Sequence, residues 1–134
     1  LEPDLPAQRV LIVDDDKDSR ELLSEILALD GIRCMTAASA ETALKMLKEK
    51  PSIGLVITDL RMGHIDGLDL IRQVRESERA ELPFIIVSGD ADVKDAIAAM
   101  HLRVVDFLLK PVDTGTLLEL VKHELGIMDE QTPT

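Results

Sequence analysis

Short runs of consecutive apolar residues alternate along the chain with longer segments in which apolar residues recur every three or four positions. The runs predict buried strands, and the longer segments predict amphipathic helices. Strands are expected at residues 9–13, 32–37, 53–58, 83–87 and 104–109. Helices are expected at residues 19–29, 39–50, from residue 66 onward, 92–101 and 113–126. Strands that alternate with helices in this way predict a parallel sheet covered by helices on both faces.

Polar, glycine and proline residues mark the ends of these helices. Gly31 suits the left-handed position after the first helix, Ser39 suits the N-cap of the second, and Pro51 ends it. Asp113 is the expected N-cap of the last helix. The apolar stripes are Leu22, Leu23, Ile26 and Leu27 in the first helix, Ala43, Leu44 and Leu47 in the second, Leu68, Ile71 and Val74 in the third, Val93, Ile97 and Met100 in the fourth, and Leu117, Leu120, Val121 and Leu125 in the fifth.

Two of the five strands carry a charged residue inside an apolar run. Arg33 lies in the second strand and Asp106 in the fifth. A strand at the edge of a sheet tolerates such residues, whereas a central parallel strand is buried on both faces. We therefore expect the second and fifth strands at the two edges.

Length and charge limit the classes of function. The 134 residues suffice for one domain, and 46% hydrophobic content allows a substantial core. With 26 acidic and 15 basic residues the formal net charge is −11. Nucleic acids and anionic membranes attract basic surfaces, so we expect no direct binding of either by this segment. No apolar run approaches the length of a membrane span and no charged-then-apolar leader is visible, so we expect a cytoplasmic location.

A single cysteine excludes an internal disulfide framework. Cys34 lies among apolar residues of the second predicted strand. A small core residue is a better interpretation of it than a redox centre.

Charged and polar side chains follow four of the predicted strands. Asp14 and Asp15 come after the first strand, Asp59 after the third, Ser88 after the fourth and Lys110 after the fifth. In an open parallel sheet, ligands bind beyond the carboxyl ends of the strands, where the strand order reverses. Several carboxylates and one ammonium group there predict a site for a hard cation and a phosphate group.

These residues stand in motifs that resemble the receiver domain of bacterial two-component response regulators, the family of the chemotaxis response regulator. The matching pieces are Leu11 to Asp16, Thr58 to Met62, Asp66-Gly67, Val87 to Gly89 and Phe107 to Pro111. Each piece is weak alone, but their order and their positions at strand ends are specific. The resemblance implies a flavodoxin-like (βα)5 three-layer sandwich of α/β class, with a parallel five-stranded sheet in the order 2-1-3-4-5. It divides the chain into a lead-in at 1–8, a receiver domain at 9–126 and a tail or linker at 127–134.

The resemblance also implies a function and a set of roles. Asp59 would accept a phosphoryl group from a sensor histidine kinase or a histidine phosphotransfer protein, as a carboxylate nucleophile can. Mg²⁺, or Mn²⁺ in its place, would bind Asp15, Asp59 and the backbone carbonyl of Arg61, with Asp14 acting through a water molecule. Lys110 and Ser88 would contact the phosphoryl oxygens.

A phosphoryl group must bias a two-state element to carry a signal. By resemblance, Ser88 and Phe107 form the switch, and the fourth helix, fifth strand and fifth helix form the output face. An output domain or a separate partner protein would read that face, and a homodimer through it is compatible with the sequence. The Lys110-Pro111 bond resembles the cis peptide of the family.

Three features depart from the family pattern. Gly63 stands where the family usually has proline, so a less constrained loop is expected. Arg103 stands where glycine is common, and a side chain there disfavours the left-handed conformation. We therefore expect an altered path into the fifth strand. Arg61 and Asp90 flank the site, and opposite charges there would shield an aspartyl-phosphate from water.

Two other functions are open at this point. A receiver fold can act as a protein-binding module without phosphorylation, although the complete acidic set argues against it. A Mg²⁺-dependent phosphohydrolase is the least favoured, because Asp59-Leu60-Arg61 lacks a second carboxylate two residues after the nucleophile. The sequence thus predicts a signalling phosphoacceptor rather than an enzyme, one that assists its own phosphorylation and dephosphorylation.

Overall fold

The computed structural model describes residues 9–127, and the expected lead-in at 1–8 and nearly all of the expected tail lie outside that range. Five parallel strands form one sheet in the order β2-β1-β3-β4-β5. They are β1 (Val10–Val13), β2 (Cys34–Ala37), β3 (Leu55–Thr58), β4 (Phe84–Ser88) and β5 (Asp106–Leu109). The predicted strand order, with β2 and β5 at the edges, is confirmed.

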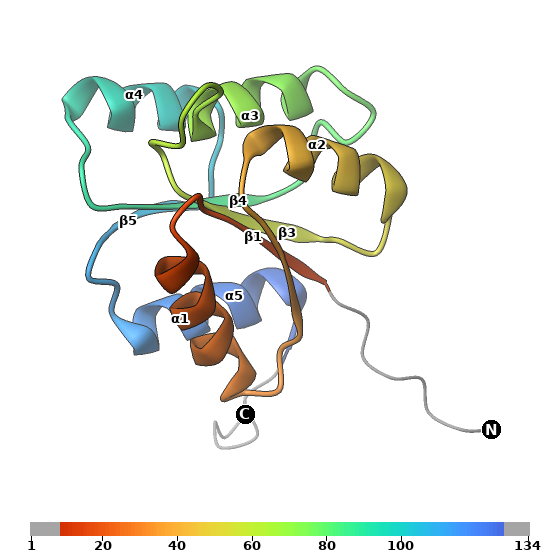
Figure 1. Cartoon of the computed structure of the whole chain (residues 1–134), viewed down its shortest axis with the longest axis vertical. Helices are drawn as coiled ribbons and strands as arrows, with labels where there is room; N and C mark the ends of the chain where they lie inside the picture. Colours follow the sequence, from red (N-terminus) through yellow and green to blue (C-terminus); the bar gives the residue numbers. More distant parts are fainter. Residues whose placement is uncertain (1–8, 128–134) are drawn as a thin grey trace.

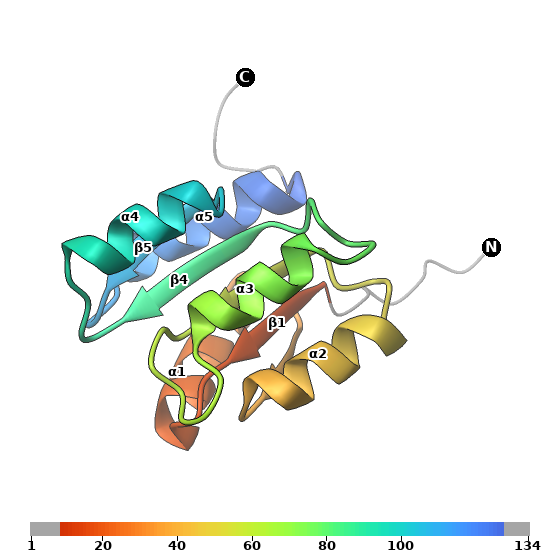
Figure 2. The same cartoon turned by 90° about the horizontal axis from the view of Figure 1, so that it is seen from above.

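Helices cover both faces of the sheet. They are α1 (Lys17–Ala28), α2 (Ala40–Glu49), α3 (Gly67–Arg75), α4 (Val93–His101) and α5 (Thr114–Leu125). Figures 1 and 2 show α2, α3 and α4 on one face and α1 and α5 on the other. This is the flavodoxin-like three-layer arrangement that the sequence predicts.

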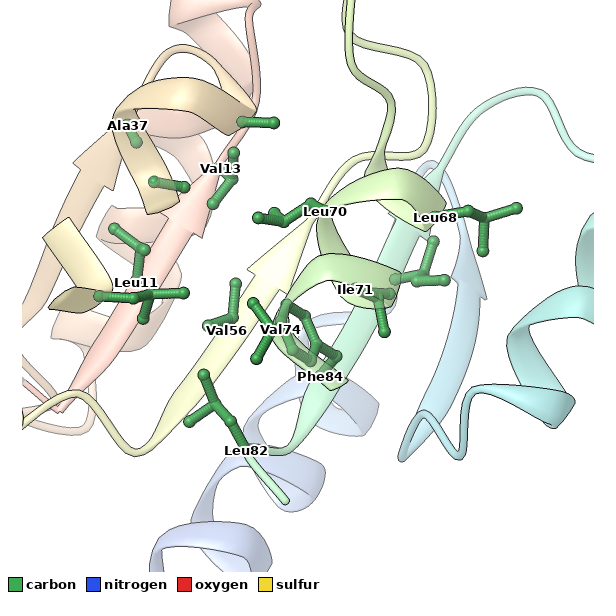
Figure 3. Packing of buried hydrophobic residues seen from close by; sticks show 14 of the residues in the cluster. Leu11, Val13, Ala37, Val56, Leu68, Leu70, Ile71, Val74, Leu82 and Phe84 are labelled. Atoms are coloured by element: carbon green, nitrogen blue, oxygen red, sulfur yellow. The ribbon is translucent and has the colours of Figure 1, made fainter. Parts of the chain in front are cut away.

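The sheet separates two layers of buried apolar side chains. One layer joins the sheet to α2, α3 and α4, and the other joins it to α1 and α5. Figure 3 shows the first layer, where Leu70, Ile71 and Val74 of α3 lie over Val56 and Phe84 of the sheet. Phe84 is fully buried, as are all residues of β1 and β3. Burial of these side chains fixes the register of the strands, because a one-residue slip would turn them to the opposite face.

The structure corrects two expectations about α1. The helix begins at Lys17 instead of residue 19, because the Asp16 side chain accepts a hydrogen bond from the Asp18 N–H and caps it. The buried face is Leu23, Ile26 and Leu27, whereas the side chain of Leu22 is 56% exposed. The predicted stripe was therefore one residue too wide.

The apolar stripe of α4 lies on the solvent side of the helix. Val93, Ile97 and Met100 are exposed, and the buried residues are Asp95 and Ala99. A small side chain at Ala99 lets α4 lie close to the sheet. The apolar residues of this helix therefore mark its solvent-exposed face and not the face that packs on the sheet.

The expectation that Arg103 avoids the left-handed conformation is wrong. Arg103 adopts φ 61°, the left-handed conformation in which glycine is usual. Its N–H donates to Met100 O at 3.0 Å, and Val105 N–H donates to Phe84 O at 2.7 Å, which brings the chain into register with β4. Arg75 supports the turn by donating from Nε to Leu102 O at 2.8 Å.

Two further points concern the described residues. None of their helices is both long and apolar enough to cross a membrane. Cys34 is partly buried against the layer of α1 and α5 rather than in the core, and burial raises the pKa of its thiol to about 12, which disfavours a reactive thiolate.

We predict that Arg103→Gly stabilises the protein by about 0.5–1 kcal/mol, because glycine takes a positive φ without steric cost. Arg103→Ala is the matched control, since it removes the same charge but keeps the strained conformation, and it should gain less. Chemical denaturation would give both free energies of unfolding. Equal values for the two variants would contradict the conformational explanation.

Candidate functional site

The site begins where β1 ends. The backbone ladder continues one residue beyond the strand, with Asp14 N–H donating to Ala37 O at 3.1 Å. Asp14 is 1% exposed, and its Oδ1 accepts from the Asp16 N–H at 2.9 Å. Arg20 donates to the Asp14 carbonyl at 2.7 Å. Asp14 is therefore fixed from both sides, while the next residue, Asp15, is exposed.

Asp59 occupies the equivalent place after β3. Its N–H donates to Val13 O at 2.8 Å, which sets it beside the end of β1. Its Oδ1 accepts from the Leu60 N–H at 2.6 Å. Gly67 packs directly under this residue, and a Cβ atom there would overlap the Asp59 carbonyl oxygen. Glycine is required at this close approach of two backbone segments.

Lys110, the residue after β5, contacts both aspartates. Its Nζ donates to Asp14 Oδ2 at 3.0 Å and lies 3.5 Å from Asp59 Oδ2. The same nitrogen donates to Ser19 Oγ at 3.0 Å. The sequence analysis did not identify Ser19. Its position in the first turn of α1, four residues after Asp15, was the available signal.

The electrostatics of the cluster favour a cation. Carboxylate oxygens of Asp14, Asp15 and Asp59 all lie within 4.8 Å of one another. With Lys110 the four groups carry a formal charge of −3 + 1 = −2 when ionised. Burial and the Asp14 charge raise the pKa of Asp59, against the opposing effect of Lys110. For Lys110, burial lowers the pKa, but hydrogen bonding and attraction to Asp14 outweigh it and leave a net increase. Three converging carboxylates fit a hard divalent cation such as Mg²⁺.

Ser88 ends β4, and Phe107 lies in the neighbouring strand β5. Ser88 is 1% exposed, and its Oγ accepts from the Asp90 N–H at 3.2 Å and donates to Asp90 O at 3.1 Å. The hydroxyl thus bonds its own loop. Phe107 pairs with Ile86 in the sheet register and packs, half-buried, against the layer of α2, α3 and α4.

The loop after Asp59 has two local features that the sequence did not indicate. The Arg61 guanidinium pairs with Asp95 of α4 at 2.7 Å. Gly63 has φ +64°, a conformation that the ring of proline, with φ near −65°, cannot adopt. The expected cis peptide is present at Lys110-Pro111.

Comparison with known proteins gives consistent similarities. The sequence model of the response regulator receiver domain matches residues 10–122. The chain is 38% identical over 119 residues to the C4-dicarboxylate transport transcriptional regulatory protein DctD of Pseudomonas aeruginosa, covering 89% of this chain and 25% of that protein. It is 37% identical to the response regulator protein FleR of the same species, covering 90% and 25%. It thus spans about a quarter of the length of these relatives.

A solved structure is also similar over most of its length. The crystal structure of a response regulator receiver protein from Pseudomonas putida superimposes with a TM-score of 0.83 and 56% identity, covering 85% of this chain and 94% of that one.

We predict that Asp59→Asn stabilises the metal-free protein at neutral pH by about 1 kcal/mol or less, because Lys110 already offsets part of the cost of the ionised group. A raised pKa means that ionised Asp59 opposes folding, so the gain should shrink as the pH falls from neutrality towards the ordinary aspartate pKa and should vanish below it. Thermal unfolding from pH 3 to 8 in chelator would measure it. Asp18→Asn, an exposed acid nearby, is the control. A gain that grew at low pH would contradict the assignment.

Proposed function

Because the chain belongs to the response regulator receiver domain family and is the receiver of a two-component regulator, we propose that Asp59 is its phosphoacceptor. The observation that supports this most strongly is the Lys110 ammonium bridging Asp14 and Asp59. A carboxylate that must attack an anionic phosphoryl group needs positive charge beside it. The three carboxylates and the ammonium group that such a transfer needs lie in one cluster, which supports the proposal.

The proposed reaction forms one bond and breaks one bond. An oxygen of the Asp59 carboxylate forms an O–P bond, while the P–N bond to the donor histidine breaks and the imidazole leaves with the electron pair. The Asp59 side chain is 13% exposed, so a donor would reach the part of it that still faces solvent. Because Leu60 N–H already holds Oδ1, Oδ2 beside Lys110 is the better candidate nucleophile.

The acidic cluster provides the ligands that a divalent cation requires. Asp15 and Asp59 would hold Mg²⁺ directly, together with the backbone carbonyl of Arg61, and Asp14 would act through water. When bound, the ion neutralises charge on the acceptor and on the incoming phosphoryl group. Mn²⁺ prefers similar oxygen ligands and is the expected substitute.

Lys110 and Ser88 would contact the transferred group. Lys110 Nζ is flexible enough to exchange Ser19 and Asp14 for a phosphoryl oxygen. Ser88 would exchange its bonds to the Asp90 backbone for a bond to the phosphoryl group. We further propose that Phe107, which packs in the same layer as Leu102 and Val104, follows Ser88 and alters the face made by α4, β5 and α5.

The partners are proposed from the family and from the relatives. A sensor histidine kinase or a histidine phosphotransfer protein would supply the phosphoryl group. DctD is named a transcriptional regulatory protein and is about four times longer than the matched segment, so an output domain or a partner protein is the proposed reader of the signal. The domain would serve as a signalling phosphoacceptor that assists its own turnover, and a homodimer through the output face is compatible with this role.

The proposal predicts covalent phosphorylation that depends on both the cation and one residue. Incubation with acetyl phosphate and Mg²⁺ should add one group of about 80 Da by intact mass. The gain should disappear in Asp59→Asn and in chelator, whereas Asp18→Asn should be modified like the unaltered protein. Modification of Asp59→Asn at the normal level would contradict the assignment. A protein that binds Mg²⁺ but is never modified, even by a histidine phosphotransfer donor, would favour the phosphorylation-independent module.

A further inference from the structure

An ion pair links the acceptor loop to α4. Arg61 follows Asp59 by two residues, and its guanidinium contacts Asp95 Oδ2 in the first turn of α4 at 2.7 Å. The Arg61 side chain is 49% exposed, but that of Asp95 is only 11% exposed. A pair with one buried partner is screened less by solvent than an ordinary surface pair.

The Asp95 carboxylate also caps the N-terminus of α4. Asp95 Oδ2 accepts from the Asp92 N–H at 3.0 Å, while Asp92 Oδ1 accepts from the Asp95 N–H at 2.9 Å. These two bonds form a capping box at the start of α4. One oxygen atom, Asp95 Oδ2, therefore joins the cap of α4 to the side chain of Arg61.

Burial of Asp95 is unusual within the described residues. Besides Asp95, the buried polar or charged residues there are Asp14, Thr58 and Ser88. Those three lie at the carboxyl ends of β1, β3 and β4. Asp95 is the member of this group that lies in a helix, and Arg61 connects it to the acceptor loop.

The loop that carries Arg61 is held on its inner side. Leu60 and Met62 are buried, Leu60 N–H donates to Asp59, and Gly67 N–H donates to Leu60 O at 2.8 Å. Between these buried neighbours, the Arg61 side chain points outward and is held by Asp95. The orientation of the peptide that carries the Arg61 carbonyl therefore depends on bonds at both sides of the loop.

We propose that Asp95 is a positioning residue for the cation and phosphoryl site, acting through Arg61. This proposal rests on the proposed function. In it, Asp95 holds the Arg61 side chain and so orients the Arg61 carbonyl, as residues behind the ligands do in other metal sites. Coupling between two sites is reciprocal. Occupation of the acidic cluster therefore alters the first turn of α4, and with it the exposed stripe of Val93, Ile97 and Met100.

The test uses Mg²⁺ alone as the probe, with calorimetric titration for affinity and amide NMR for α4. Asp95→Asn keeps an oxygen for the capping box but removes the charge that holds Arg61. It should weaken Mg²⁺ binding by about tenfold. In the unaltered protein, Mg²⁺ should shift the amides of residues 93–101, and in Asp95→Asn these shifts should shrink to a minor fraction.

The chain offers a matched control in α3. Asp69 holds the same position in the capping box of Asp66 and Asp69, and it pairs with Arg72 of its own helix at 3.0 Å. Asp69→Asn therefore removes a cap charge and an ion pair that do not reach Arg61. Its Mg²⁺ affinity should stay within about twofold of that of the unaltered protein.

A second variant separates the ion pair from the stability of α4. Arg61→Gln breaks the pair without changing the helix cap, and adding Asp95→Asn to it should weaken Mg²⁺ binding no further. Additive losses, or an unchanged affinity and unchanged α4 shifts in Asp95→Asn, would overturn the positioning role while leaving the phosphoacceptor proposal intact. No Mg²⁺ binding by the unaltered protein would overturn both.

Discussion

The contact of the Lys110 ammonium with Asp14 and Asp59 is the interaction on which the rest of the site depends. Two carboxylates separated by 45 residues along the chain (59 − 14) are placed side by side because β1 and β3 are neighbours in register, with Val13 opposite Thr58. Lysine arrives from the far edge strand, where Lys110 N–H bonds Ser88 O. A parallel sheet aligns the carboxyl ends of its strands, so the fold itself concentrates the charge.

This concentration of charge opposes folding locally and is tolerated because the sheet beneath it is packed between apolar layers. Burial and the neighbouring Asp14 raise the pKa of Asp59, so its ionised form is disfavoured until positive charge is added. Two complete hydrophobic layers beneath the site hold the strands in register despite that repulsion. The excess of carboxylates over ammonium groups at the site is the basis for both the proposed cation and the proposed phosphoryl transfer. The ion pair of Arg61 with Asp95 extends the same charge network from the acceptor loop to α4.

The strand order, the edge positions of β2 and β5 and the convergence of Asp14, Asp59 and Lys110 could be predicted, because they follow from apolar runs and from family motifs at strand ends. Other features depend on three-dimensional contacts that no periodicity encodes. Leu22 has an apolar side chain at a helical spacing but lies beyond the edge of the buried face. Ser19 and Asp95 are ordinary helix-start residues in sequence, and only the fold reveals their partners. Arg103 takes a glycine-like conformation because the surrounding turn and Arg75 hold it there.

The central claim is that the acidic cluster binds one divalent cation at the acceptor. Anomalous diffraction from crystals soaked in Mn²⁺ would test it most directly, since it locates the ion without assuming its ligands. We expect one strong peak in contact with the carboxylates of Asp15 and Asp59 and the carbonyl oxygen of Arg61. A map with no peak there, or with Mn²⁺ bound only at other surface acids, would contradict the account.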